Sequence, residues 1–473
     1  MFPQIPAAVL APISRITTLT ALDLSGNKIY GRLPTPMLSN LTNLLSLNLQ
    51  YNNFDGPIPS QLFQHKSLIS LNIQANSLTG TLSSDVGLLR NLEELVLYQN
   101  YLEGNLPTEL GSLVNLKTVG LGQNYFTGVL PPMENLRRIE SLRLQSNEFT
   151  GTIPSWIFDL ENLTKLDLGG NNFSWNHTFE QCNPKFIKLT TLSLWLCGLT
   201  GKIPTWVSSL VNLKALNLSH NNLEGELPVP LGMLNIVDMR LNNNNLTGFL
   251  PRQFLESSSL QFLNLCNNKL FGELRSNVSR ISYLSLCNNN FSGKIPPSIA
   301  RSQNAKTLDL SGNSFSGGIP RFEEGLKMLD LSSNELDGDA SVSYPSTLVK
   351  LSLGENRLSG FIDGNLTGLR SLLILELHSN NITGEIPTSI SDMSGLEHLN
   401  LHNNSLHGSI PGGISAMHSL QSLYLSSNKL SGGIPNFRAD SMLVIVDFSS
   451  NNLKGGISVI YPSKLKVLFL RKQ

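Results

Sequence analysis

Apolar and polar positions alternate in one short phrase that recurs along the whole chain. The segment LDLSGNKIYGRLP at residues 22–34 returns as LNLQYNNFDGPIP at 47–59, as LRLQSNEFTGTIP at 142–154 and as LELHSNNITGEIP at 375–387. The shared pattern is LxxLxLxxNxLxGxIPxxL, and its steps are mostly 23 or 24 residues. Because no such unit can bury its own leucines, the period predicts a repeat array in which every unit packs on its neighbours.

Each position of the pattern has a physical role. The LxL step predicts a short strand with one buried face, since successive side chains of a strand point to opposite sides. The asparagine amide both donates and accepts, so it can satisfy backbone groups of its own coil and the next. Glycine permits a tight bend, and proline fixes φ and stops the strand pattern. We therefore expect an α/β right-handed solenoid of about 20 coils of roughly 21–26 residues, with a parallel β-sheet on the concave face and short helical or irregular segments on the convex face.

The asparagines of successive coils are expected to form a stacked ladder, in which one cysteine takes the place of an asparagine. The ladder positions are Asn27, Asn52, Asn76, Asn100, Asn124, Asn147, Asn171, Cys197, Asn221, Asn244, Asn268, Asn289, Asn313, Asn334, Asn356, Asn380, Asn404, Asn428 and Asn451. The repeat places no histidine and acid around Cys197, so we expect a buried structural thiol and not a nucleophile.

Composition excludes several function classes. Lysine plus arginine equals aspartate plus glutamate at 34 each, and charged residues make up 14% of the chain, which argues against a nucleic-acid partner. The sequence holds no Walker loop, no Rossmann fingerprint, no GxSxG elbow and no HExxH motif. We therefore expect no enzyme activity, no cofactor and no metal.

The repeat pattern covers residues 19–473, and residues 1–18 are expected to form a partial repeat without a proper N-terminal cap. The start MFPQIPAAVLAPISR makes a poor signal peptide, because its first positive charge is Arg15. No window approaches the roughly 20 apolar residues that a membrane span needs. The array ends mid-repeat in LKVLFLRKQ, so we expect a segment truncated at both ends.

The consensus LxxLxxLxLxxNxLxGxIPxxLGxL closely resembles the plant-specific class of leucine-rich repeats. The GxIP or GxLP step recurs in most coils, for example at residues 56–59, 293–296, 384–387 and 408–411. The segments NNFSWN at 171–176, CGLTGKIPTWV at 197–207 and YPSKLKVLFL at 461–470 resemble the kinase-less receptor-like proteins. In that family an extracellular repeat domain is followed by one membrane span.

The resemblance implies a receptor ectodomain on the extracellular side of the plasma membrane, with a role in defence or developmental signalling. Its ligand would be a peptide, a protein or a glycan bound on the concave or lateral surface, and a co-receptor kinase would be its signalling partner. The family's arginine pair for a peptide carboxylate has no matching RxR here. A secreted inhibitor of microbial cell-wall-degrading enzymes and a receptor fragment without its own function remain alternatives.

Two further cysteines, Cys266 and Cys287, stand at equivalent sites in consecutive coils, in LNLCNN and LSLCNN. Lateral strand spacing would place their Cα atoms about 5 Å apart, which is within the range that a disulfide allows. The sequence leaves open whether they form a lateral disulfide or two surface thiols.

Glycosylation sequons are numerous. Several of them arise from the repeat consensus, which contains phrases such as NNLTG. They begin at Asn40, Asn162, Asn172, Asn176, Asn217, Asn245, Asn277, Asn290, Asn365, Asn381 and Asn403. Asn176 and Asn277 lie outside the repeated phrases and are therefore the stronger candidates.

Outward strand positions form two candidate ligand-binding patches on the expected concave face. The first is an aromatic and amide strip able to grip a peptide or a sugar, and it contains Tyr51, Gln74, Tyr98, Arg143, Gln145 and Trp195. The second contains Glu355, Glu376, His378, His398, Asn400, His402 and Tyr424. Trp195 is either a binding anchor or a wall residue that packs over neighbouring coils.

His378 and His402 occupy the same site in adjacent coils, so they should lie side by side. Histidine side chains change charge near neutral pH, and we predict that ligand binding through the second patch changes between about pH 5 and 7. Affinity measured across that range checks the prediction, and an unchanged affinity would contradict it.

Overall fold

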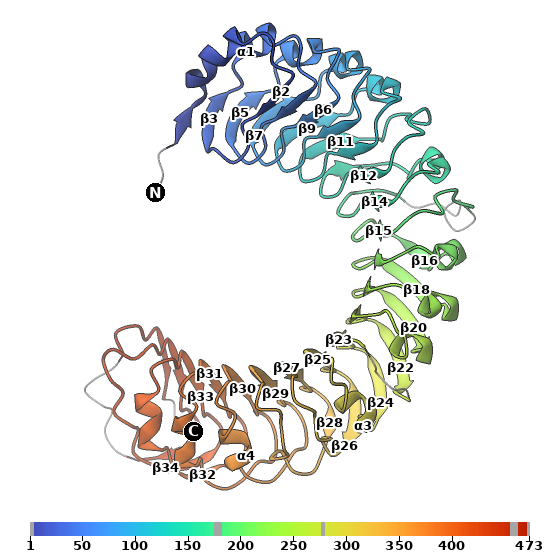
Figure 1. Ribbon diagram of the computed structural model, residues 1–473. Helices are drawn as coiled ribbons and strands as arrows, with labels where there is room; N and C mark the ends of the chain where they lie inside the picture. Colours follow the sequence, from blue (N-terminus) through green and yellow to red (C-terminus); the bar gives the residue numbers. More distant parts are fainter. Residues whose placement is uncertain (1–3, 175–181, 276–279, 455–461, 471–473) are drawn as a thin grey trace. The chain divides into compact units, whose positions relative to one another are not determined.

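The computed structural model describes residues 4–174, 182–275, 280–454 and 462–470. The chain forms two compact units, and each is described here by itself. Unit 1 contains Met1–Glu224 and Leu234–Asn244, and unit 2 contains Gly225–Met233 and Asn245–Gln473. Both are built from stacked coils whose short strands pair in parallel (Figure 1).

The LxL steps form the main sheet of each unit, with one strand per coil. In unit 1 its strands are β2 (Ala21–Asp23), β4 (Ser46–Asn48), β6 (Ser70–Asn72), β8 (Glu94–Val96), β10 (Thr118–Gly120), β12 (Ser141–Arg143), β14 (Lys165–Asp167), β15 (Thr191–Ser193), β17 (Ala215–Asn217) and β19 (Asp238–Arg240). In unit 2 they are β21 (Phe262–Asn264), β23 (Tyr283–Ser285), β25 (Thr307–Asp309), β27 (Met328–Asp330), β29 (Lys350–Ser352), β30 (Ile374–Glu376), β31 (His398–Asn400), β33 (Ser422–Tyr424), β35 (Ile445–Asp447) and β37 (Val467–Phe469).

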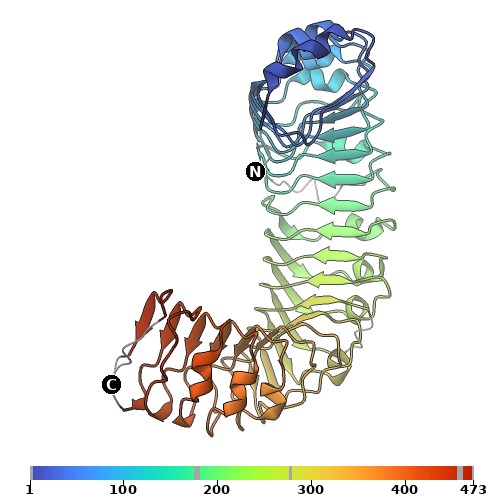
Figure 2. The same ribbon diagram turned by 60° about the vertical axis from the view of Figure 1, so that its left-hand side comes forward.

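Equivalent leucines of the main sheet are in register. Leu47 pairs with Leu71, and Leu71 pairs with Leu95, and all three are buried. The strands therefore stack like rungs, as Figure 2 shows, with one face in the core and the alternating side chains on the outside. This arrangement confirms the predicted parallel sheet.

A second, lateral sheet follows the asparagine positions, and the sequence interpretation did not include it. In unit 1 it contains β1 (Ile5–Pro6), β3 (Ile29–Arg32), β5 (Asn53–Pro57), β7 (Ser77–Thr81), β9 (Tyr101–Asn105), β11 (Tyr125–Gly128) and β13 (Glu148–Phe149), and β16 (Thr200–Lys202) pairs with the first half of β18 (Asn222–Glu226). In unit 2 it contains β20 (Asn245–Phe249), β22 (Lys269–Glu273), β24 (Asn290–Gly293), β26 (Ser314–Gly317) and β28 (Glu335–Leu336), and a separate sheet contains β32 (His407–Ser409), β34 (Lys429–Gly432) and β36 (Asn452–Leu453).

Glycine lies inside these lateral strands because the chain bends there. Gly80 in β7 has φ +78°, a left-handed conformation that glycine adopts without steric cost. Such a segment is a poor strand former by itself, and pairing with the neighbouring coils is what makes it a strand.

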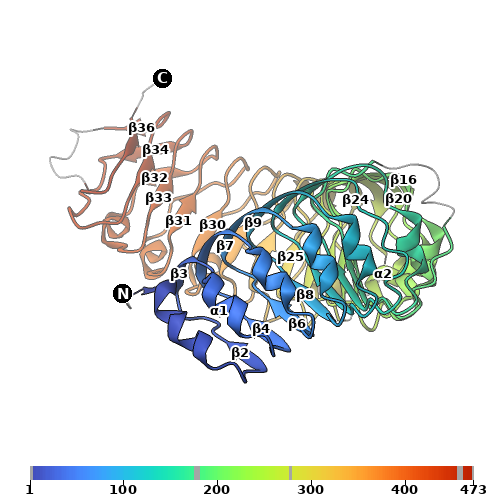
Figure 3. The same cartoon turned by 90° about the horizontal axis from the view of Figure 1, so that it is seen from above.

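Short helical segments return the chain, in most coils directly after the proline step. The α-helices are α1 (Thr35–Asn40), α2 (Arg252–Leu255), α3 (Pro297–Ala300) and α4 (Gly364–Thr367), and the 3-10 helices are η1 (Ala7–Arg15), η2 (Ser60–Gln64), η3 (Ser84–Leu88), η4 (Thr108–Ser112), η5 (Ser155–Asp159), η6 (Thr205–Ser209), η7 (Val229–Met233), η8 (Thr388–Asp392) and η9 (Gly412–Ala416). Pro59, with φ −71° and ψ 141°, is extended and directly precedes η2. Figure 3 shows α1 and the neighbouring turns side by side along one edge of unit 1.

Phenylalanines at the apolar position after the asparagine form stacked columns in the core. In unit 1 the rings of Phe126 and Phe149 lie 6.2 Å apart, and those of Phe149 and Phe173 lie 6.4 Å apart. In unit 2 the rings of Phe291 and Phe315 lie 6.3 Å apart. Each coil thus completes the apolar core of the next one.

The asparagine amides connect each coil to the one before it. Nδ2 of Asn76 donates to the carbonyl of Ile73 in its own coil at 3.1 Å and to that of Leu49 in the preceding coil at 3.0 Å. Its Oδ1 accepts the backbone N–H of Phe54 at 3.0 Å. The same three contacts recur at Asn124, Asn221 and Asn380. Since a buried backbone group without a partner costs about 1–3 kcal/mol, these amides hold the stack together.

Cys197 takes over part of this role with its thiol. Its Sγ lies 3.3 Å from the carbonyl oxygen of Leu168 in the preceding coil and 3.5 Å from that of Trp195. The side chain is fully buried, and burial strongly raises the pKa of this thiol. The group is therefore a protonated donor and lacks the thiolate character of a nucleophile.

Cys266 and Cys287 are joined in a disulfide, with their Cα atoms 4.5 Å apart. The bridge links neighbouring coils of unit 2 at the outward side of the main sheet. Of the two alternatives that the sequence leaves open, the structure has the lateral disulfide. Closing a loop of this size stabilises a fold by about 3 kcal/mol in the chain-entropy estimate.

Thiol labelling checks both cysteine environments. We expect the unreduced, denatured protein to label at Cys182 and Cys197 only, and the reduced protein to label at all four cysteines, because the disulfide protects the other two. In the native protein Cys182, which is half-buried, should label well before Cys197. Mass spectrometry after alkylation measures each site. Four labelled sites without reductant would contradict the bridge, and fast native labelling of Cys197 would contradict its role in the ladder.

Candidate ligand-binding surface

The outward side chains of the main sheet alternate with the buried leucines, and a tight backbone turn follows each strand. The residue just before the ladder position is left-handed in most coils, with φ 54° at Tyr51 and 56° at Glu355. The turn aims these side chains away from the core, and Tyr51 is 60% exposed. The variable positions of the repeat therefore form one continuous surface within each unit.

Glycines leave part of the backbone in the first patch without side chains, and this bare backbone forms the floor of the patch. Gly120 on β10 is in register with Arg143 on β12, so no side chain stands beside the guanidinium on that side. Gly122 leaves room for Gln145, whose Oε1 would lie only 2.7 Å from a Cβ built on the glycine. Large polar side chains of one coil thus lie down over the bare backbone of the coil before it.

Trp195 lies across a glycine pair in the same manner. A Cβ built on Gly170 would lie 2.7 Å from the indole ring, and one on Gly169 would overlap the ring. The indole is half-buried. The indole therefore packs over a neighbouring coil, and its role as a binding anchor stays a prediction.

Asp167 is a functional candidate that sequence reasoning missed. It is in register with Arg143 on one side and Ser193 on the other. Burial raises the pKa of this carboxyl, opposed by the side-chain hydrogen bond of Ser193, by the backbone N–H of Gly169 at 3.1 Å and by the charge of Arg143. A half-buried acid with a raised pKa beside an exposed arginine is costly for the fold, and groups of this kind cluster at functional sites. The signal in the sequence was LDLGG, an acid followed by two glycines on the ligand face.

The remaining side chains of the first patch differ in how they are held. Burial raises the pKa of Tyr98, and the charge of Asp167 adds to this effect. Gln74 donates to Gln50 Oε1 at 2.7 Å. Oε1 of Gln145 is buried against Gly122 and has no hydrogen-bond partner among the described residues, which is a local cost to the fold.

In the second patch, serines of neighbouring coils position the polar side chains. Ser352 donates to Glu376 Oε2 at 2.5 Å, and Nδ1 of His398 lies 2.6 Å from Ser422 Oγ. Nδ1 of His402 lies 2.8 Å from Ser426 Oγ. Ser333 donates to Glu355 Oε2 at 2.6 Å.

The register of the main-sheet strands places other members of the second patch beside one another. Glu376 pairs with Asn400, and Asn400 pairs with Tyr424. His378 lies over Gly354 of the preceding coil. Sequence reasoning missed the ion pair of Lys350 Nζ with Asp330 Oδ2, which spans 2.9 Å on the same face.

The described residues contain a single group of three side chains with the geometry to hold a metal ion, formed by Cys266, Cys287 and Asp309. Its two sulfurs are bonded to each other in the disulfide. The histidines of the second patch are not part of such a group within the described residues.

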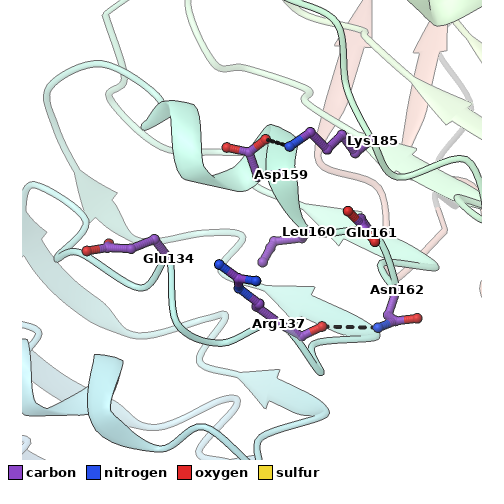
Figure 4. Close-up of a pocket in the computed structure, with 7 residues that line it drawn as sticks. All are labelled: Glu134, Arg137, Asp159, Leu160, Glu161, Asn162 and Lys185. Carbon is purple, nitrogen blue, oxygen red and sulfur yellow. Dashed lines mark hydrogen bonds and ion pairs between the residues drawn. The ribbon is translucent and has the colours of Figure 1, made fainter.

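A pocket of about 290 Å³ beside η5 is an alternative site in unit 1 (Figure 4). Its lining has charges of both signs, from Glu134, Arg137, Asp159, Glu161 and Lys185, with Leu160 and Asn162 between them. Lys185 Nζ is 2.9 Å from Asp159 Oδ1, and both side chains are more than half exposed, so this ion pair contributes little. Because the charges largely neutralise one another, we place the candidate site on the main sheet.

The predicted sequons fall in several environments. Asn40, Asn172, Asn290, Asn365, Asn381 and Asn403 are exposed, and Asn162, Asn217 and Asn245 are partly buried. Asn162 Nδ2 donates to the carbonyl of Arg137 at 3.1 Å, and Asn217 Oδ1 accepts from Ser219. Asn176 and Asn277 lie outside the described residues.

Comparison with known families gives one clear result. A family model described as a leucine-rich repeat region matches residues 2–239, which is half of the chain, and leucine-rich-repeat models match residues 280–302, 304–323, 346–406 and 374–430. The chain belongs to the leucine-rich-repeat family. The predicted family and fold class are thereby confirmed. Comparison with curated protein sequences found no match.

Solved structures show which class of leucine-rich-repeat protein this chain is similar to. A structure of the Arabidopsis receptor kinase HAESA with the peptide hormone IDA and the co-receptor SERK1 is 32% identical and covers 96% of this chain and 81% of that one, with a TM-score of 0.74. A TDR receptor structure is 25% identical over 98% of this chain and 95% of that one, with a TM-score of 0.74. A PEPR1–AtPEP1 structure is 27% identical over 93% and 73%, with a TM-score of 0.65.

This leucine-rich-repeat chain is therefore an ectodomain of the plant receptor class, a ligand-binding module and not an enzyme. The receptor ectodomains that it matches are extracellular. No helix among the described residues is long and apolar enough to cross a membrane.

Replacing Asp167 by asparagine tests the cost of its burial. The raised pKa means that the fold is more stable with Asp167 protonated, and that this contribution is lost as pH rises through the folded-state pKa. We expect Asp167→Asn to raise the thermal midpoint at pH 7, and the gain to vanish below about pH 4, where the unfolded carboxyl is protonated as well. Thermal unfolding at the two pH values measures it.

Asp23 offers a matched control for this substitution, because it stands at the same position of the repeat. Hydrogen bonds from Ser25 lower the pKa of Asp23, and the residue is exposed. Asp23→Asn should therefore leave the midpoint unchanged or lower it at pH 7. A loss of stability in Asp167→Asn would contradict the assignment of Asp167 as a strained group.

Proposed function

We propose that this chain is the ligand-recognition ectodomain of a plant cell-surface receptor for a peptide signal in defence or development, acting with a co-receptor kinase at the plasma membrane. The observation that carries the proposal is the glycine-floored patch of unit 1, where Arg143, Asp167, Gln145 and Trp195 surround bare backbone. An extended peptide fits such a surface, because its own backbone and side chains find charged, amide and aromatic partners there.

Similar structures support a peptide over the other ligand classes. The HAESA structure holds a peptide hormone together with a co-receptor, and the PEPR1 structure is a complex with AtPEP1. The alignment with the HAESA structure covers 96% of this chain. A protein of this class enters the secretory pathway, so the exposed sequons are expected to carry N-glycans.

A displayed library of random twelve-residue peptides, selected on the full chain, tests the proposal. We expect bound peptides whose affinity falls at least about 30-fold in Arg143→Ala and in Trp195→Ala, because well-packed interface anchors typically contribute 2 kcal/mol or more. The control is Lys188→Ala, a cation away from the main sheet whose Nζ bonds Asn162. Peptides that bind the variants and the control equally well would contradict this site.

A further inference from the structure

The lateral sheet of unit 2 exposes two phenylalanines at one spot. Phe249 on β20 is 64% exposed and Phe271 on β22 is 40% exposed. Their ring centroids are 4.8 Å apart in an edge-to-face arrangement. Other phenylalanines of this unit, such as Phe291 and Phe315, are buried in the core. Exposed aromatic surface of this kind is unfavourable in water unless something covers it.

Glycine lets the two rings meet in one apolar surface, which we call the platform. A Cβ on Gly272 would lie 2.5 Å from the ring of Phe249, so the phenylalanine leans over the backbone of the next strand. Gly272 also has φ +91°, a backbone conformation that favours glycine independently of the contact with the ring. The platform therefore depends on the local backbone and is not an accident of one flexible side chain.

A sequon asparagine stands next to this platform in the register of the sheet. Phe249 pairs with Phe271 in the parallel ladder, and Phe271 pairs with Asn290 on β24. Paired residues of neighbouring strands point to the same face, with Cβ atoms about 4.5–5.5 Å apart. The three side chains thus form one row. Asn290 begins the sequon Asn290-Phe291-Ser292, is exposed, and makes no side-chain hydrogen bond to the described residues.

We propose that Asn290 carries an N-linked glycan whose first N-acetylglucosamine lies against Phe271 and Phe249. One face of this sugar is lined by C–H groups, which pack on an aromatic ring, while its hydroxyl and acetamido groups stay in water. The contact removes the exposed phenylalanine surface from solvent, and it fixes the glycan on the lateral sheet. The inference rests on the proposed entry into the secretory pathway.

Not every sequon at the same repeat position has such a platform. Asn172 donates its backbone N–H to Phe149, which places it beside Thr150 on the neighbouring coil. A sugar on Asn172 therefore meets a small polar side chain. Asn381 is less suitable as a control, because the exposed Phe361 is paired with Thr383 of its sequon and leans over Gly384. Asn172 is therefore the matched control.

The experiment uses the full chain, secreted with an added leader from cells that make only high-mannose glycans, and trimmed enzymatically to one N-acetylglucosamine per site. Glycopeptide mass spectrometry measures occupancy, and thermal unfolding measures the effect. We expect Asn290 to be occupied, and Ser292→Ala, which removes the sequon, to lower the midpoint by about 1–3 °C. In the Phe249→Ala/Phe271→Ala background the same change should have no effect.

The controls distinguish an effect of the sugar from an effect of the Ser292 side chain. Ser174→Ala removes the Asn172 sequon and should leave the midpoint unchanged in both backgrounds. Ser292→Ala should also be silent in protein made without glycans in bacteria. An unoccupied Asn290, no midpoint change in the secreted protein, or an equal change in both phenylalanine backgrounds would overturn the proposal. Because the leader supplies secretion, these results do not depend on peptide binding, and a failure of the proposed receptor function leaves them unaffected.

Discussion

The two short strands of a coil leave some interior backbone N–H and C=O groups unpaired. In most coils one asparagine amide satisfies these groups, and in one coil the thiol of Cys197 takes over part of this role. The contact tolerates different coil lengths. Asn289 follows Asn268 by 21 residues and Asn52 follows Asn27 by 25, yet their amides donate to the preceding coil at 2.9 and 2.8 Å. The extra residues are taken up elsewhere in the coil. The array must therefore preserve the distance from the strand to the ladder amide. If this distance changed, buried backbone groups would lose their partners, and each such group lowers the stability of the fold.

Fixing the interior in this way leaves the outward positions free to vary. The leucines and asparagines of the repeat cannot change without loss of packing or hydrogen bonds, whereas the side chains between them contact solvent and one another. In unit 1 this freedom has placed Arg143, Asp167 and Trp195 on neighbouring coils around glycines. A site built in this manner is flat and extended, which suits a chain-like ligand better than a small molecule held in a deep cavity.

The repeat pattern was sufficient to predict the main sheet and the ladder positions, because these depend on spacing alone. The family was predicted from the resemblance of the consensus phrase to plant-specific leucine-rich repeats. The lateral sheet could not be read from spacing, since Gly80 and its neighbours have low strand propensity and pair only after the coils have stacked. The disulfide of Cys266 and Cys287 was one of two open alternatives, because equivalent positions fix the distance between coils but not the direction of each side chain. Asp167 was missed for a related reason: its partners Arg143 and Ser193 come from the two neighbouring coils, which no local motif reveals.

The departures from the repeat are more informative than the repeat itself. A sequence optimised only for stacking would have no reason to bury the Asp167 carboxyl, to leave Gln145 Oε1 without a partner or to expose Phe249 beside Phe271. Each of these features costs stability in the isolated chain, by desolvation, by a missing hydrogen bond or by exposed apolar surface. Local costs of this kind persist where a ligand or a modification compensates them, and they tend to occur at functional positions. The three features named here fall on outward-facing positions of the main and lateral sheets. The two surfaces proposed here are thus identified by where the fold is locally unfavourable and not by where it is most regular.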